Sequence, residues 1–162
     1  METLWEKKLK FFIEFRKVTG FYFPLRKTNF LKKKSVREDR LFYILTDLYF
    51  SNRAKFEKLY QNIEIWIKKF DIEEVWVLGG YIYYIIQEFE KARDYLLKAI
   101  FINPENLDNW LDFAFVLRHL GEYKMSYTIL FYYDQIIRSY IPPAKKNYKE
   151  LRRVILKSLE NA

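Results

Sequence analysis

The chain has 162 residues, of which 51% are hydrophobic and 31% charged, and it contains no cysteine. This length and apolar content exclude a disordered chain and suffice for the core of one domain, and the lack of cysteine excludes disulfides and thiolate metal sites. The net charge of +8 is uneven, because residues 1–70 carry seventeen Lys and Arg against eight Asp and Glu, residues 71–140 carry six against eleven, and residues 141–162 carry six against two.

Neither a secretion signal nor a membrane span is apparent. Glu2, Glu6 and several lysines interrupt the first turns, where a signal peptide would need an apolar run. The longest uncharged stretch, from Val75 to Gln87, is shorter than the roughly 20 residues that cross a bilayer. We therefore expect a cytoplasmic protein.

Residues 1–34 predict an N-terminal helix followed by an arm. The helix is expected over residues 2–18, with Gly20 as its stop. Apolar residues at helical spacing are expected to face the core: Leu4, Trp5, Leu9, Phe12, Ile13 and Phe15. From Phe21 to Lys34 the periodicity is lost, and the sequence is aromatic and basic.

Residues 35–70 predict a helical hairpin. Ser35 opens an S-x-x-E capping box, in which two unpaired backbone donors are satisfied reciprocally. Ser51-Asn52 interrupts the apolar pattern, and a second helix is expected over residues 53–69.

Residues 71–140 predict two further hairpins, and residues 141–162 a closing helix. Asp71 and Asn106 are expected to cap helices, while Pro104 and Gly121 separate them. Lysines and arginines after Pro143 suit the polar outer face of a terminal cap. The predicted fold is all-α, a short α-solenoid of antiparallel helix hairpins with an N-terminal helix and a C-terminal capping helix.

Two copies of one pattern follow each other at a spacing of thirty-four residues. Residues of the first copy align with residues of the second as follows: Trp76 with Trp110, Gly80 with Ala114, Tyr83 with Leu117, Phe89 with Tyr123, Ala92 with Ser126, and Leu96 with Leu130. With Pro104 closing the first copy, this pattern resembles the signature of the tetratricopeptide repeat family. The resemblance covers residues 73–138 well and residues 36–70 only as a degenerate hairpin.

The resemblance implies where the helices pack. Gly80 and Ala92 should lie where the two helices of a hairpin approach most closely, and large residues should fill the space between hairpins. The residues expected in this packing are Trp76, Gly80, Tyr83, Ala92, Leu96, Pro104, Trp110, Ala114, Tyr123 and Leu130. Two positions depart from the family pattern: Gly79 stands where Leu is usual, and Tyr133 replaces a small residue.

The resemblance also implies a concave groove lined by the first helix of each hairpin. By register its residues are Glu74, Val77, Leu78, Tyr81, Tyr84, Ile85, Asp108, Leu111, Asp112, Phe115, Arg118 and His119. The upstream hairpin would add Arg40, Tyr43, Ile44 and Asp47. This aromatic and acidic set suits an apolar peptide or helix that carries positive charge.

We therefore expect a non-enzymatic interaction module, an adaptor, scaffold or chaperone, with no cofactor and no metal. His119 is the only histidine and stands near a predicted helix end, where a structural role is the default. The groove's occupant is expected to be a protein or peptide, or the chain itself, through residues 21–34 or a second copy. The alternative is nucleic-acid binding by the basic N-terminal third. Membrane association through residues 2–18 is the least favoured.

Overall fold

The computed structural model describes residues 1–24, residues 40–138 and Arg153. Within these residues the chain is helical and has no β-strand, which confirms the all-α class. The helices are α1 (Leu4–Thr19), α2 (Arg40–Ser51), α3 (Arg53–Phe70), α4 (Glu73–Ile85), α5 (Phe89–Ile102), α6 (Leu107–His119) and α7 (Tyr123–Arg138). The capping box predicted at Ser35, the arm after Pro24 and, apart from Arg153, the closing helix predicted within residues 141–162 lie outside the described residues.

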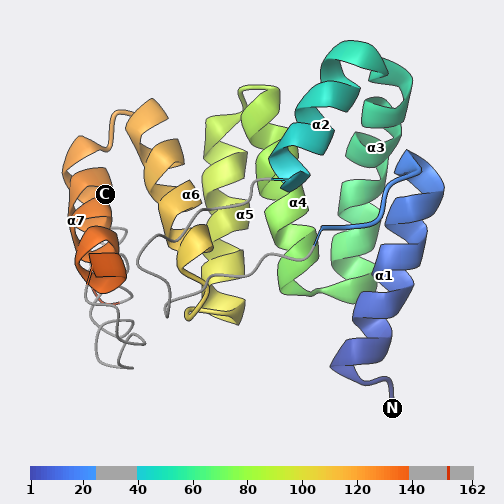
Figure 1. The fold of residues 1–162 in the computed structure, drawn as a ribbon, viewed down its shortest axis with the longest axis horizontal. Helices are drawn as coiled ribbons and strands as arrows, with labels where there is room; N and C mark the ends of the chain where they lie inside the picture. Colours follow the sequence, from blue (N-terminus) through green and yellow to red (C-terminus); the bar gives the residue numbers. More distant parts are fainter. Residues whose placement is uncertain (25–39, 139–152, 154–162) are drawn as a thin grey trace.

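The helices succeed one another along the long axis of the molecule, with α1 at one end and α7 at the other (Figure 1). From α2 to α7 each helix packs against the next one in the chain, whereas α1 packs against α3. Helix α2 also reaches α4. Short connections between α2 and α7 make consecutive helices antiparallel neighbours.

Helix α1 contacts the rest of the protein through an aromatic face. Phe11 and Phe15 are fully buried. The ring of Phe11 lies edge-on to Trp66 at 5.5 Å and to Phe70 at 5.9 Å, both on α3. Gly20 ends the helix in the left-handed region with φ of 80°, which confirms the predicted stop.

The predicted core face of α1 is largely wrong. The four residues Leu4, Trp5, Leu9 and Ile13 are exposed. Phe15 is buried as predicted, and Phe11, which the prediction did not include, is buried beside it. The physical reason is that aromatic rings on α3 match them, so the helix turns its second apolar stripe outward.

The first residues after α1 belong to the core as well. Phe23 is buried and lies 5.2 Å from Phe11, 5.1 Å from Phe15 and, stacked, 5.4 Å from Phe12. The described part of the predicted arm therefore packs on α1.

A thirty-four-residue repeat is present in the backbone itself. Helix α6 begins and ends thirty-four positions after α4, and α7 begins thirty-four after α5. The turns repeat too: Glu88 N donates to Tyr83 O at 2.8 Å, and Glu122 N donates to Leu117 O at 2.9 Å. Gln87 and Gly121, which correspond at this spacing, both have positive φ. The sequence period therefore describes a repeated turn as well as repeated helices.

Asn106 caps α6 as predicted, since its side chain accepts a hydrogen bond from Asp108 N at 3.2 Å. The predicted cap at Asp71 is wrong. Ile72 occupies the N-cap of α4 and makes no side-chain cap bond, while Asp71 ends α3 in the left-handed region. The Asp71 carboxylate accepts instead from Trp76 Nε1 at 2.8 Å. The tryptophan indole thus replaces the backbone amide as donor.

Helices α4 and α5 approach closely at two adjacent glycines. A Cβ on Gly80 would lie 2.8 Å from the side chain of Leu96, and one on Gly79 would lie 2.3 Å from the ring of Tyr95. The close approach expected at Gly80 is confirmed. Gly79 is explained by Tyr95, whose ring takes the space that a side chain at position 79 would fill.

We predict that Gly79→Leu lowers the free energy of unfolding by about 2 kcal/mol or more, because the partly buried ring of Tyr95 has to move. Urea denaturation monitored by circular dichroism would measure it. Gly121→Ala is the matched control. No atom lies within 4 Å of its added Cβ, so its loss should come from the positive φ alone, roughly 1 kcal/mol.

The double variant Gly79→Leu/Tyr95→Ala should be less destabilised than the sum of the two single variants. Strict additivity would contradict the proposed contact between residues 79 and 95.

Candidate functional site

A cavity of about 210 Å³ lies among α2, α4, α5 and α6. Its lining is mostly aromatic and aliphatic, with one carboxylate. The lining residues are Phe42, Tyr81, Tyr84, Leu96, Asp112, Phe115 and Val116. The cavity therefore combines apolar walls with a single acidic group.

Tyr81 and Asp112 join α4 to α6 at this cavity. The Tyr81 hydroxyl donates to Asp112 Oδ2 at 2.6 Å, and both side chains are buried. Because the phenol holds one oxygen of the carboxylate, its orientation in the cavity wall is fixed.

Aromatic rings form much of the remaining wall. Phe42 meets Tyr81 edge-on at 6.0 Å and Tyr84 at 6.1 Å, which connects α2 to α4. The Tyr84 hydroxyl lies 2.9 Å from His119 Nε2, and the His119 ring stacks on Phe89 at 4.6 Å. Burial raises the pKa of Tyr84, so its hydroxyl stays protonated at neutral pH.

Only part of the predicted groove lies at this cavity. Tyr81, Tyr84, Asp112 and Phe115 line it, and the Arg118 guanidinium lies 5.7 Å from the Phe115 ring. The other positions lie elsewhere: Val77, Leu78 and Asp108 are buried away from it, Leu111 and Ile85 are half-buried, and Glu74 pairs with α1. The buried members provide packing between helices, not contact surface.

The sequence reasoning missed Phe42 as a lining residue. It chose Arg40, Tyr43, Ile44 and Asp47 on this helix, none of which lines the cavity, and Tyr43 is 71% exposed. A single residue, Asn52, separates α2 from α3, whereas α4–α5 and α6–α7 are joined by longer turns. A register copied from the later hairpins does not take this shorter connection into account.

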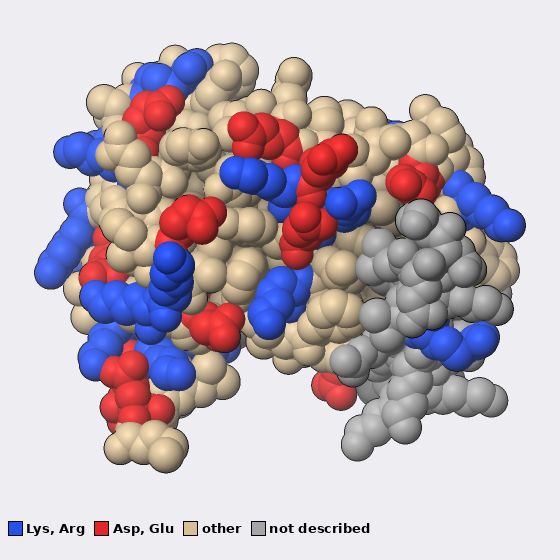
Figure 2. All heavy atoms as spheres, turned by 180° about the vertical axis from the view of Figure 1, so that it is seen from behind, with Lys and Arg blue, Asp and Glu red and all other residues tan. Residues whose placement is uncertain are grey.

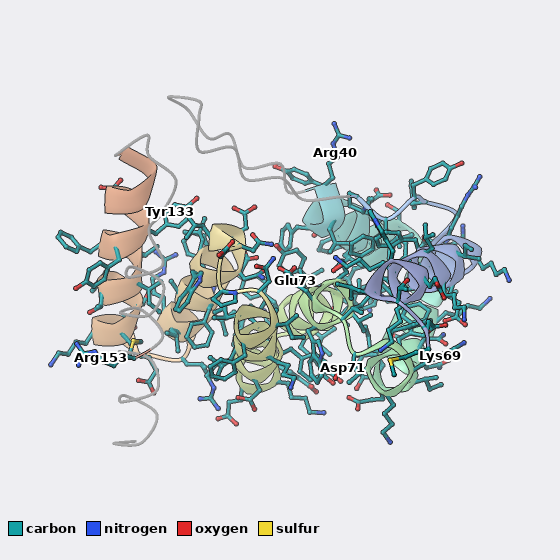
Figure 3. The ribbon with its side chains drawn as sticks, turned by 90° about the horizontal axis from the view of Figure 1, so that it is seen from below. Arg40, Lys69, Asp71, Glu73, Tyr133 and Arg153 are labelled. Carbon is teal, nitrogen blue, oxygen red and sulfur yellow. The ribbon has the colours of Figure 1, made fainter. Side chains whose placement is uncertain are left out.

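Glu73 is a second polar centre that the sequence reasoning missed. Its carboxylate accepts hydrogen bonds from three side-chain amides, Asn103 at 3.0 Å, Asn106 at 2.8 Å and Asn109 at 2.6 Å. Glu73 begins α4 (Figure 3). The three asparagines lie on the α5–α6 connection and the start of α6. These bonds fix the position of α6 relative to α4, and hence the width of the cavity.

Glu74, the next residue of α4, contacts α1. Its carboxylate lies 3.2 Å from Lys8 Nζ on α1. Burial raises the pKa of Glu74 in spite of Lys8, which acts in the opposite direction. Glu74 thus connects α4 with α1 and does not contribute charge to the cavity.

No group of three or more His, Cys, Asp or Glu suited to a metal ion occurs among the described residues. None of the described helices is long and apolar enough to cross a membrane.

Comparisons with known proteins give no relative for this chain. No protein-family profile, no curated protein and no solved structure matches it. The role of the cavity has to be argued from its own chemistry.

We predict a pH dependence of stability from Glu74. Because its folded pKa is raised, the folded protein holds this proton more tightly than the unfolded chain. The resulting stabilisation is complete below the ordinary value of 4.5 and is lost as the pH rises through the folded pKa. The unfolding free energy of the wild type, relative to Glu74→Gln, should therefore fall as the pH is raised above about 4.5.

Chemical denaturation at a series of pH values would measure this difference. Lys8→Met removes the cation that lowers the pKa of Glu74, so the loss of stability should extend to higher pH. A wild type that gains stability relative to Glu74→Gln over the same range would contradict the assignment.

Proposed function

We propose that this chain is an interaction module built from tetratricopeptide-type hairpins, which binds an apolar peptide segment bearing a basic side chain at the α2–α4–α6 cavity. The repeat assignment is supported by the helix bounds and turn hydrogen bonds that recur at thirty-four residues. It is also supported by the close approach of α4 and α5 at Gly80, the position that the family keeps small.

The single observation that carries the binding proposal is the oriented Asp112 carboxylate within an aromatic wall. A lysine or arginine side chain has an apolar stem and a cationic head. The stem would pack on Phe42 and Phe115, and the head would approach Asp112 and the faces of the tyrosine rings. An acidic side chain would meet the carboxylate and be repelled.

The cavity volume of about 210 Å³ suits one side chain better than a helix. Selectivity would then come from one anchored residue, with the neighbouring peptide lying along α4 and α6. The source of the peptide is another protein, a second copy, or residues 21–34 of the same chain. In the last case, added peptides compete with residues 21–34.

The test is a set of apolar peptides that differ at one position, which is Lys, Arg, norleucine or Glu, with binding followed by fluorescence anisotropy. Lys and Arg peptides should bind at least about tenfold more tightly than the norleucine peptide, and Glu peptides least. Asp112→Asn keeps the acceptor for Tyr81 and should remove this preference. Phe115→Ala should weaken all of the peptides.

Phe131→Ala is the matched control, because Phe131 is an exposed aromatic residue on α7. It should leave binding unchanged. A preference for Lys over Glu that survives Asp112→Asn would refute the role of this carboxylate.

A further inference from the structure

The outer face of α1 carries a stripe of exposed apolar side chains. Trp5 is 63% exposed, and Leu9 and Ile13 are each 55% exposed. These residues follow one another at intervals of four, so they lie on one side of the helix. Single exposed apolar residues are common, but an aligned set on one helix marks a contact surface.

The stripe is displayed by a helix that is firmly attached. Phe11 and Phe15 on the opposite face are fully buried, and α1 ends in a glycine cap. Lys69 on α3 also pairs with Glu14 at 2.8 Å. Because the inner face of α1 is already packed on the core, the outer stripe is not exposed through poor packing of the helix.

Basic residues predominate in α1 and in α3, the helix against which it packs. Five Lys or Arg against two Glu occur in α1, and the same numbers occur in α3, which together give a net charge of +6. Many Lys and Arg side chains, with acidic side chains among them, cover the end of the molecule formed by these helices, on the left in Figure 2. Arg16 and Lys17 are exposed at the C-terminal end of the stripe, and the Arg16 guanidinium lies 4.1 Å from the ring of Tyr22.

We infer that α1 docks this end of the protein onto a membrane surface containing anionic lipid. Trp5, Leu9 and Ile13 would enter the boundary between headgroups and acyl chains, while the neighbouring lysines and arginines contact lipid phosphates. Tryptophan suits this boundary because its ring is amphipathic. The helix lies in the plane of the surface, so no spanning segment is needed.

Charge also decides against a second copy on this face. A symmetric dimer through α1 would bring the same basic residues of two chains together. Their repulsion would oppose association, whereas an anionic surface attracts them. The membrane is therefore the occupant that fits both the apolar stripe and its charged border.

The fluorescence of Trp5 can report membrane binding directly. Trp5 is the only one of the four tryptophans that is more than about a third exposed, since Trp66 and Trp110 are buried and Trp76 is half-buried. Full-length protein mixed with phosphatidylcholine vesicles containing phosphatidylglycerol should float with them. Its tryptophan emission should shift to the blue and be quenched by brominated lipid. Vesicles of phosphatidylcholine alone should bind it at least about tenfold more weakly.

Trp5→Ala/Leu9→Ala should reduce vesicle binding at least about tenfold, with the thermal unfolding midpoint little changed, because both side chains are exposed. Trp5→Phe should retain binding but lose the spectral shift. The matched control is Tyr127→Ala/Phe131→Ala, which removes two exposed aromatic residues from α7 at the other end and should bind like the wild type.

Three results would overturn the inference. The first two are the absence of flotation with anionic vesicles at low salt and equal flotation of the Trp5→Ala/Leu9→Ala variant. The third is a wild type that is dimeric in light scattering and becomes monomeric in that variant, which would assign the stripe to a second copy. Neither readout depends on peptide binding at the cavity, so this inference and the proposed function can fail separately.

Discussion

The close contact between α4 and α5 determines the spacing of the helices around it. With no side chains at Gly79 and Gly80, the two helices approach near enough for Tyr95 and Leu96 to fill the space above the glycine backbone. Tyr95 then extends to α3, where its hydroxyl donates to Glu64 Oε1 at 2.5 Å. Tyr83 donates to the same oxygen at 3.1 Å. The glycine pair leaves room for Tyr95, and the hydroxyls of Tyr83 and Tyr95 connect α4 and α5 to α3 through Glu64.

The sequence was most informative where local chemistry and the repeat agree. Gly20, Asn106 and Gly121 predict helix ends through backbone geometry that acts within a few residues, and all three are found where expected. The period of thirty-four residues predicts where α6 and α7 begin, because each start repeats that of α4 or α5. These features need no knowledge of what the helices pack against.

Prediction failed where a partner decides the outcome. Both faces of α1 are apolar, and only the rings of Trp66 and Phe70 determine that Phe11 faces inward and Trp5 outward. Likewise, Asp71 could have capped α4, but the Trp76 indole competes for it. The cavity shows the same limit: Tyr81, Tyr84, Asp112 and Phe115 follow from the register, whereas Phe42 depends on how α2 crosses α4.

The Glu73 carboxylate, held by three asparagine amides, has a kinetic consequence. A change in the angle between α4 and α6 would have to break several charge-assisted hydrogen bonds at once. The cavity lined by Tyr81 and Asp112 is therefore rigid before any ligand arrives. A partner would meet a preformed site and would associate at a rate governed by collision and orientation, not by slow opening of the helices. Differences in affinity among ligands would then lie mainly in their dissociation rates.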